Sequence, residues 1–363
     1  MSTHKTESPE ANSAASDEVE LILGNSSSNF SGVTSTMLQV LSYQRKMTNV
    51  RVMGKHFLPD SSVYISFWQT VKMCRKPLKS GKWRVFHARR VDEMIQGVIL
   101  KYVFGAKIKL VFSSAAQRLR SGSTVWLTRK MDGVIAVSKR SATYIASDVD
   151  MVNPHGVQID EYVPAKDKLQ AWRDLGFGGK YGIGILGRVR KQKGVHLFVQ
   201  GCIEVLQKHP EYHAVVVGAI SGSNKEFVEQ LKHDIEAASL SKRITFTGEL
   251  PFAQIPAIFS ALSLVCALSD NEGFGLTVLE AMSSGAAVLA TEAGAWEEIV
   301  RPGVDGYIVP VNDQAAVTEK MDLLLSDSDA LLELGRNGRT SVESQYSVQD
   351  EARRLLDYFR SLQ

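Results

Sequence analysis

The sequence has few cysteines, and their spacing matches neither a disulfide pattern nor a zinc-binding pattern. Cys74, Cys202 and Cys266 lie far apart among 363 residues, and no C-x-x-C pair occurs. This spacing excludes a zinc ribbon and a disulfide-stapled scaffold. The amino terminus lacks an apolar signal segment, and the polar residues 1–18 predict a disordered tail. These absences favour a cytoplasmic protein.

Long apolar runs are also missing, apart from one uncharged stretch at 250–269. Its twenty residues are enough to span a bilayer in principle. Pro251, Pro256 and several serines interrupt the stretch. We therefore expect a short helix followed by a buried strand here.

The small net charge of the whole chain hides two halves with net charges of opposite sign. Residues 1–165 carry 22 Lys and Arg against 13 Asp and Glu, a net charge of +9, whereas residues 166–363 carry 20 against 26, a net charge of −6. A basic half predicts an anionic partner, and nucleic acid, an anionic membrane surface and a phosphorylated ligand are all candidates. The alternative is a solvated basic face without a partner.

Short apolar runs alternate with helical patterns along the whole chain, which is typical of α/β domains with parallel sheets. Predicted strands lie at 19–24, 50–54, 83–88, 108–114, 133–138, 181–187, 213–218, 243–248, 263–269, 286–291 and 306–310. Predicted helices lie at 92–105, 195–209, 224–238, 275–284, 314–326, 329–344 and 348–361.

The strand-poor segment 153–180 separates two such arrays, and predicts two doubly wound domains with a cleft between them. The tail covers residues 1–18, the first domain 19–168 and the second domain 169–345. The last helix, 346–363, is a candidate to pack back on the first domain. Ligands of doubly wound sheets bind beyond the carboxyl ends of the strands, so we expect the site there.

Two motifs match known ligand-binding patterns in their letters but not in their surroundings. Gly182, Gly184 and Gly187 match G-x-G-x-x-G, but the first two lie inside a predicted strand and no helix opens directly after the third. Close packing in a central strand is the better interpretation. Asp148 and Asp150 form a D-x-D, yet no further acidic residue completes a metal site. We predict no bound metal.

A basic loop and an acidic loop carry the chemistry of the second domain. Residues 187–194 (GRVRKQKG) follow a strand and open a helix, so Arg188 and Lys193 meet free backbone N–H groups there, which favours phosphate. Residues 269–285 again join a strand to a helix, with Glu272 on the loop and Glu280 in the helix. Carboxylates beside a phosphate site suggest hydrogen bonds to sugar hydroxyls.

The first domain offers two candidates. Residues 30–36 (FSGVTST) form a loop in which Thr34 or Ser35 could cap a helix. His87 ends a predicted strand, and Arg89 and Arg90 follow it. A structural histidine is the alternative to a site residue at position 87.

Several of these segments together resemble the retaining glycosyltransferases of family 4, which have the GT-B fold of two Rossmann-like domains. Residues 267–291 look like the family's E-x7-E signature, 187–194 like its phosphate loop, 153–164 like its interdomain segment, and 293–310 like another of its motifs. Residues 29–36 and 85–90 look like the lipopolysaccharide-core mannosyltransferases of α-proteobacteria.

The resemblance implies a role for each candidate residue. Arg188 and Lys193 hold the donor diphosphate, and Gly32 approaches it from the other domain. Glu272 binds the transferred sugar, and Glu280 binds the ribose. The remaining implied donor contacts are Gly273, Phe274, Gly275, Leu276 and Thr277, and the implied acceptor contacts are His87, Arg89 and Arg90, with His87 also in a catalytic role.

The resemblance also implies the reaction, a metal-independent transfer of mannose from GDP-mannose to the inner-core Kdo of lipopolysaccharide, without a separate cofactor or nucleic acid. An acceptor of this kind is anionic and membrane-bound, so we expect peripheral attachment to the cytoplasmic face of the inner membrane. One departure is that 111–114 (VFSS) stands where many members carry a T-x-H histidine. That role is either absent or passed to His87. The alternatives are a UDP-sugar donor on another envelope glycan, a sugar-nucleotide-binding protein without turnover, and a nicotinamide enzyme.

Overall fold

The computed structural model describes residues 18–363, and the predicted tail at 1–18 lies outside this range apart from its last residue. The described chain divides into two compact units. Unit 1 contains residues 18–112, 130–132 and 358–363, and unit 2 contains residues 113–129 and 133–357. The predicted domain boundaries at 168 and 345 stay predictions.

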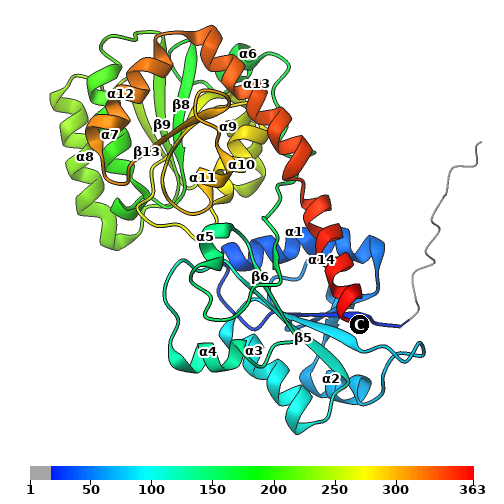
Figure 1. Ribbon diagram of the computed structural model, residues 1–363. Helices are drawn as coiled ribbons and strands as arrows, with labels where there is room; N and C mark the ends of the chain where they lie inside the picture. Colours follow the sequence, from blue (N-terminus) through cyan, green and yellow to red (C-terminus); the bar gives the residue numbers. More distant parts are fainter. Residues whose placement is uncertain (1–17) are drawn as a thin grey trace, which may run out of the picture. The chain divides into compact units, whose positions relative to one another are not determined.

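Each of the two sheets has the strand order of a doubly wound α/β fold (Figure 1), which confirms the predicted fold class. The first has the order β3-β2-β1-β4-β5-β6-β7, and its pairs β1–β2, β1–β4, β2–β3, β4–β5 and β6–β7 are parallel. Its strands are β1 (Leu21–Gly24), β2 (Val50–Met53), β3 (Tyr64–Ile65), β4 (Arg84–Ala88), β5 (Ile108–Ser114), β6 (Gly133–Ala136) and β7 (Met151–Val152).

The second sheet has the order β10-β9-β8-β11-β12-β13, and all its pairs are parallel. Its strands are β8 (Tyr181–Leu186), β9 (Tyr212–Val217), β10 (Ile244–Gly248), β11 (Leu262–Ala267), β12 (Ala287–Thr291) and β13 (Gly306–Val309). In both sheets the strand order reverses once, between β1 and β4 and between β8 and β11. These reversals are where ligands of such folds bind.

Short helices precede or follow most strands of the first sheet. They are α1 (Gly32–Met47), η1 (Ser61–Val63), α2 (Phe67–Cys74), α3 (Val91–Val98), the π-helical turn η2 (Ile99–Val103), α4 (Gly122–Thr128) and α5 (Lys139–Ala142). The predicted single helix at 92–105 is therefore α3 continued by η2, and Gly105 ends it with a φ of 64°. The predicted caps Thr34 and Ser35 were wrong, because α1 begins earlier, with Ser31 at its N-cap.

The second sheet has helices on both faces, because alternate residues of its strands point to two separate apolar cores. Ile183 and Ile185 of β8 face α7 (Val195–Val205), α8 (Lys225–Ala237) and α12 (Gln314–Leu325). The other core includes α6 (Lys168–Asp174), α9 (Ile255–Ala261), α10 (Leu276–Ser283), α11 (Trp296–Ile299) and α13 (Ser328–Gln345). The remaining elements are η3 (Lys191–Lys193), η4 (Gly222–Asn224), η5 (Phe252–Gln254) and α14 (Val348–Leu362).

The two weak sequence motifs have structural roles. Gly182 and Gly184 lie inside β8, and a Cβ atom would come within 2.3 Å of Trp172 at the first and 2.8 Å of Leu262 at the second. These glycines serve close packing, as predicted. Asp150 accepts a hydrogen bond from the Val134 amide at 2.7 Å.

The uncharged stretch 250–269 contains η5, α9 and β11, which confirms a short helix followed by a buried strand. Between residues 18 and 363, no helix has the length and apolar character that crossing a membrane requires.

Candidate active site

The loop after β8 depends on two glycines. Gly187 has a φ of 135° and Gly218, after β9, has a φ of 149°. A Cβ atom on Gly218 would lie 1.9 Å from the Gly187 carbonyl oxygen, so only glycine permits this approach of the two strand ends. The loop then turns Arg188, which is exposed, onto the wall of a cavity.

The basic loop continues through η3 into α7, as the sequence predicts. Gly194 joins them with a φ of 71°, and a Cβ atom there would lie 2.1 Å from the Leu268 carbonyl oxygen. The Asp270 amide donates to the Gln192 carbonyl at 3.0 Å. Lys193 forms an ion pair with Glu272 in the loop after β11. The structure thus joins the predicted phosphate loop to the predicted acidic loop.

The acidic loop is held in place by a neighbouring glycine turn. The Ala295 amide donates to the Phe274 carbonyl at 3.1 Å, and Trp296 Nε1 donates to the Gly275 carbonyl at 2.9 Å. Gly275 has a φ of 87°, and a Cβ atom there would lie 2.3 Å from the Trp296 ring. After this turn α10 begins, and the first N–H groups of a helix have no partner within it. Leu276 and Thr277 stand at this end, where an anion is favoured.

A cavity of about 280 Å³ lies beyond the carboxyl ends of β8, β9 and β10, beside α9 and α10. Its apolar wall includes Leu250, Ile255 and Phe259, and its polar wall includes Arg188, Glu249, Thr277 and Glu280. Tyr162 also lines this cavity, so the structure brings together one cation, two hydroxyls and two carboxylates beside an apolar surface. Such a cavity suits a ligand with a flat apolar ring, hydroxyl groups and negative charge.

Glu280 is a half-buried acid that lines this cavity. Burial raises the pKa of its carboxyl group from 4.5 to about 7, and the hydrogen bond from Tyr162 opposes that rise. The Tyr162 hydroxyl donates to Glu280 Oε1 at 3.2 Å, and burial with the nearby Glu280 raises the pKa of the tyrosine. Sequence reasoning missed Tyr162 because it stands 118 residues from its partner.

His155 is a second residue that sequence reasoning missed. Its ring lies edge-on to Phe274, with the centroids 5.1 Å apart, and its Nδ1 lies 2.8 Å from Glu351 Oε1. The other oxygen of Glu351 accepts from the Gly156 amide at 2.7 Å. His155 thus connects the acidic loop to α14. Its place in the predicted interdomain segment was the signal that could have found it.

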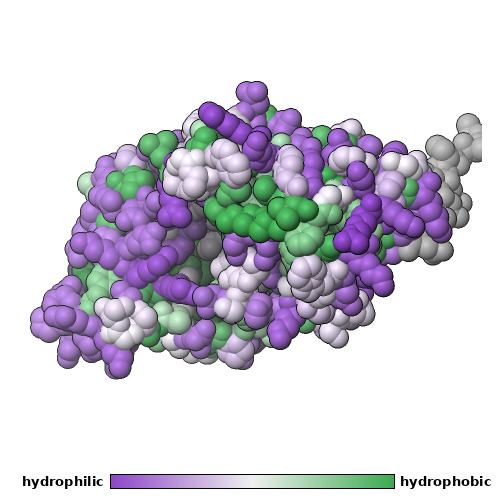
Figure 2. Space-filling model, turned by 90° about the horizontal axis from the view of Figure 1, so that it is seen from below, coloured by the Kyte–Doolittle hydropathy of each residue, from purple (hydrophilic) through white to green (hydrophobic). Residues whose placement is uncertain are grey.

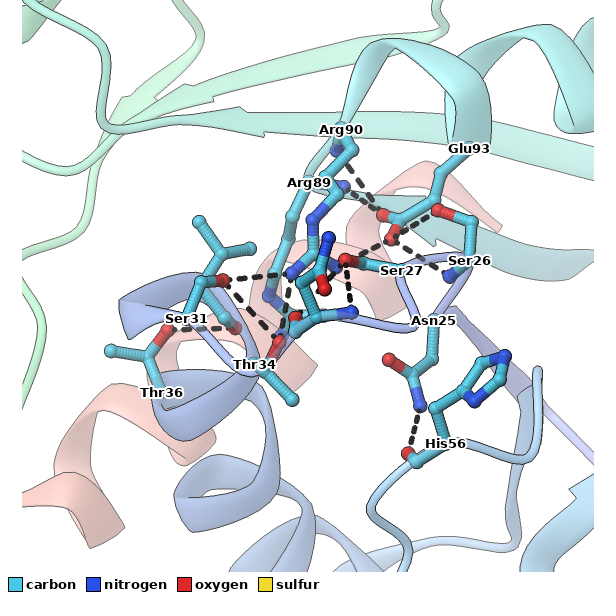
Figure 3. A network of polar contacts seen from close by, with 12 residues as sticks. Asn25, Ser26, Ser27, Ser31, Thr34, Thr36, His56, Arg89, Arg90 and Glu93 are labelled. Atoms are coloured by element: carbon cyan, nitrogen blue, oxygen red, sulfur yellow. Dashed lines mark hydrogen bonds and ion pairs between the residues drawn. The ribbon is translucent and has the colours of Figure 1, made fainter. Parts of the chain in front are cut away.

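Two candidates of the first sheet, Arg89 and Arg90, lie around one buried carboxylate (Figure 3), that of Glu93 at the start of α3. Glu93 accepts from the amides of Arg89 and Arg90 at 2.7 and 3.1 Å, and from the Arg90 side chain at 3.1 Å. Arg90 also donates to Ser31 at 3.0 Å and to Thr34 at 2.8 Å. This network fixes the start of α1 against the end of β4, and the sequence analysis did not predict Glu93.

The other candidates of unit 1 have different surroundings. His87 is 1% exposed, and its ring packs edge-on against Phe359 of α14 at 5.0 Å between centroids. Gly32 opens α1, and no atom lies within 4 Å of a Cβ atom built there. The roles of Gly32, His87, Arg89 and Arg90 toward a ligand stay predictions. The segment at 111–114 is the end of β5.

The two doubly wound sheets are those of the GT-B fold. HepE of Anabaena, solved in complex with UDP, has the same fold with a TM-score of 0.81 at 18% identity, over 94% of this chain and 100% of that chain. The C-terminal domain of the glycosyl transferase group 1 protein LpcC from Francisella tularensis is 39% identical, with a TM-score of 0.52, over 53% of this chain and 99% of that chain.

Sequence comparison makes the assignment more specific. A family model described as Glycosyl transferases group 1 matches residues 172–341. Two relatives named lipopolysaccharide core biosynthesis mannosyltransferase are each 36% identical over 95% of this chain: LpcC of Rhizobium leguminosarum bv. viciae over 97% of its own length, and LpsB of Rhizobium meliloti over 98%. The chain belongs to the glycosyl transferases group 1 family, as the resemblance predicted.

Proposed function

We propose that this enzyme transfers mannose from GDP-mannose to the inner-core Kdo of lipopolysaccharide, with retention of the sugar's configuration and without a metal ion. The observation that carries the proposal is the junction of two loops at the reversal of the second sheet. There Lys193 meets Glu272, while Arg188 and Glu280 line one cavity. The names of the two relatives similar over nearly the whole chain support mannose and the lipopolysaccharide core.

The proposed roles follow from where charge develops in the reaction. Breaking a sugar–phosphate bond leaves an electron-poor sugar carbon and a diphosphate that gains negative charge. Arg188 and Lys193 stabilise that diphosphate, and preorganised cations act strongly in a site that excludes water. Glu272 lies beside Lys193 and accepts hydrogen bonds from the transferred sugar. The backbone N–H groups of Gly275, Leu276 and Thr277 bind the phosphate end.

The nucleoside lies in the cavity in this proposal. Glu280 accepts hydrogen bonds from the ribose hydroxyls, and Tyr162 orients its carboxylate. The apolar wall of Leu250 and Ile255 packs against the base. Retention without an enzyme nucleophile implies attack from the face that the diphosphate leaves, with a phosphate oxygen accepting the acceptor's proton.

The acceptor belongs to the basic first half of the chain in this proposal. His87, Arg89 and Arg90 bind it, and Gly32 approaches the donor diphosphate. Because a lipopolysaccharide core is anionic and membrane-bound, the enzyme attaches peripherally to the cytoplasmic face of the inner membrane.

The direct test is product formation with a defined donor and acceptor. We expect GDP-mannose and a Kdo-bearing acceptor to give an α-linked mannosyl product, identified by mass spectrometry and NMR, at a rate that EDTA does not change. Transfer from UDP-glucose or UDP-galactose alone would replace the proposed donor. Binding of GDP-mannose without product would favour a non-catalytic binding protein.

A further inference from the structure

The helix α3 and its continuation η2 are apolar on two opposite sides. Met94, Gly97 and Leu100 form the buried side, which packs on the first sheet. A Cβ atom on Gly97 would lie 2.9 Å from the Leu110 side chain and 3.0 Å from the Phe86 ring. This close approach fixes which side of the helix meets the sheet.

The other side of the same helix faces solvent. Ile95, Ile99, Tyr102 and Val103 follow the spacing i, i+4, i+7 and i+8, and all four are exposed, Val103 to 71%. A surface helix normally carries polar residues on the side away from its core. Figure 2, which views the molecule from below, shows apolar side chains gathered at the centre of that face.

Trp68 of α2 extends this surface. It is 67% exposed, and its ring lies edge-on to Phe104 at 5.4 Å between centroids. Phe104 directly follows η2 and also contacts Phe67 at 5.8 Å. We define the apolar patch as Trp68, Ile95, Ile99, Tyr102 and Val103.

The segment that carries Trp68 is basic. Residues 61–91 contain no Asp or Glu. Lys72 stands one helical turn after Trp68, and is exposed. Further exposed cations in this segment are Arg75, Lys76, Lys79 and Lys82.

We propose that the apolar patch and the cations of 72–82 dock this enzyme on the surface of an anionic lipid bilayer. Tryptophan and tyrosine favour the interface between hydrocarbon and water, aliphatic side chains enter the acyl boundary, and lysines bind anionic headgroups. A bilayer fits better than a second copy of this chain, because two copies would bring two basic segments together. The inference deepens the proposed function, since it assigns a surface to the membrane attachment proposed there.

The test is cosedimentation of the full chain with vesicles. The probe is a vesicle of equal parts phosphatidylglycerol and phosphatidylethanolamine at low salt, compared with a phosphatidylcholine vesicle. The apolar double variant, Trp68→Ser with Val103→Ser, removes apolar contact with the bilayer. The lysine double variant, Lys72→Gln with Lys76→Gln, removes positive charge. Leu323→Ser is the matched control, because Leu323 is an exposed leucine of α12, in unit 2. Thermal melting checks that each variant folds.

We expect the wild type and Leu323→Ser to bind anionic vesicles equally. The apolar double variant should bind at least about tenfold more weakly, and the lysine double variant about fivefold more weakly for each lysine lost. Turnover of GDP-mannose with a soluble, delipidated Kdo acceptor should stay unchanged in both. Equal binding of vesicles by the wild type and the apolar double variant would overturn the inference. It would also be overturned if the wild type formed a dimer in solution and the apolar double variant were a monomer.

The same experiment separates the two proposals. One outcome is that GDP-mannose gives no product with the soluble Kdo acceptor while vesicle binding still depends on Trp68 and Val103. The proposed function then fails and the docking surface stands. If the soluble acceptor is mannosylated but no variant changes vesicle binding, the docking surface alone fails.

Discussion

Arg90 and Arg188 each lie two residues after a strand at a reversal of strand order, Arg90 after β4 and Arg188 after β8, and their surroundings differ. The Arg90 guanidinium donates hydrogen bonds to Glu93, Ser31 and Thr34. Arg188 is exposed and lines a cavity. The difference teaches that an arginine just after a strand can be held by partners within its own unit, as Arg90 is, or can be left exposed at a cavity, as Arg188 is.

The largest expected effect is on Arg188. If its charge stabilises the developing diphosphate as proposed, Arg188→Ala should lower kcat by about 10²–10³-fold with GDP-mannose and a Kdo acceptor. Arg336→Ala is the control, since Arg336 is an exposed arginine of α13 that pairs with Glu333. Steady-state kinetics of both variants test this. A loss of equal size in the control would contradict a specific role for Arg188.

Glu93 should matter for stability more than for chemistry. Its carboxylate is 0% exposed and accepts from three amides, those of Ser26, Arg89 and Arg90, and from the Arg90 side chain. Glu93→Gln leaves the arginine without its counter-charge, so the free energy of unfolding should fall by about 2–4 kcal/mol. Urea denaturation measures the change. An unchanged midpoint would mean that the network does not hold the start of α1.

Alanine substitutions of Gly275 and Gly32 compare a strained glycine beside the second sheet with an unstrained one beside the first. Gly275→Ala adds a side chain at a φ of 87° and against Trp296, so it should destabilise the acidic loop by about 2 kcal/mol and weaken GDP binding. Gly32→Ala meets open space at the first helical position and should change the melting temperature little. If Gly32 approaches the diphosphate, this variant nevertheless loses turnover.

Full activity of Gly32→Ala would remove Gly32 from the donor site. A melting temperature of Gly275→Ala equal to that of the wild type would contradict the strain argument. Steady-state kinetics measure the activity of Gly32→Ala, and thermal melts with and without GDP test Gly275→Ala.

The smallest predicted effect depends on pH. The pKa of Glu280 rises from 4.5 to about 7 on folding, so between these values the folded state holds the proton more tightly than the unfolded state. Stability due to this group is therefore present below about pH 4.5 and is lost as the pH rises toward 7. Glu280→Gln should gain about 1–3 kcal/mol of stability at pH 8, and the gain should shrink toward pH 5.

The same substitution should weaken GDP binding at pH 8, because an amide accepts ribose hydrogen bonds less well than a carboxylate. Thermal melts across this pH range, with and without GDP, check both signs. A variant that is less stable than the wild type at pH 8 would contradict burial as the source of the shift.

The sequence predicted the second sheet closely because most of its strands are largely apolar runs, and β8, β9 and β10 end at or directly before a glycine. The predicted strands at 181–187 and 286–291 differ from β8 and β12 by one residue. The basic and acidic loops were also predictable, because each is a short segment with its own residue pattern.

The sequence did not predict short elements or contacts between distant residues. β3 has two residues and α5 has four, which is too few for a periodic pattern. Glu93 looked like an ordinary acidic residue near a helix start, and its burial depends on the loop after β1, 67 residues away. Tyr162 and His155 acquire their roles only through partners more than a hundred residues away along the chain.

The central claim is that the nucleotide sugar binds the loops after β8 and β11, and thermal stabilisation by ligands tests it most directly. The account predicts that GDP and GDP-mannose stabilise the wild type by about 2.7 kcal/mol at 100 times Kd, that UDP, UDP-glucose and NADH do not, and that Arg188→Ala loses the effect. Stabilisation by NADH alone, or stabilisation by GDP that survives Arg188→Ala, would contradict it.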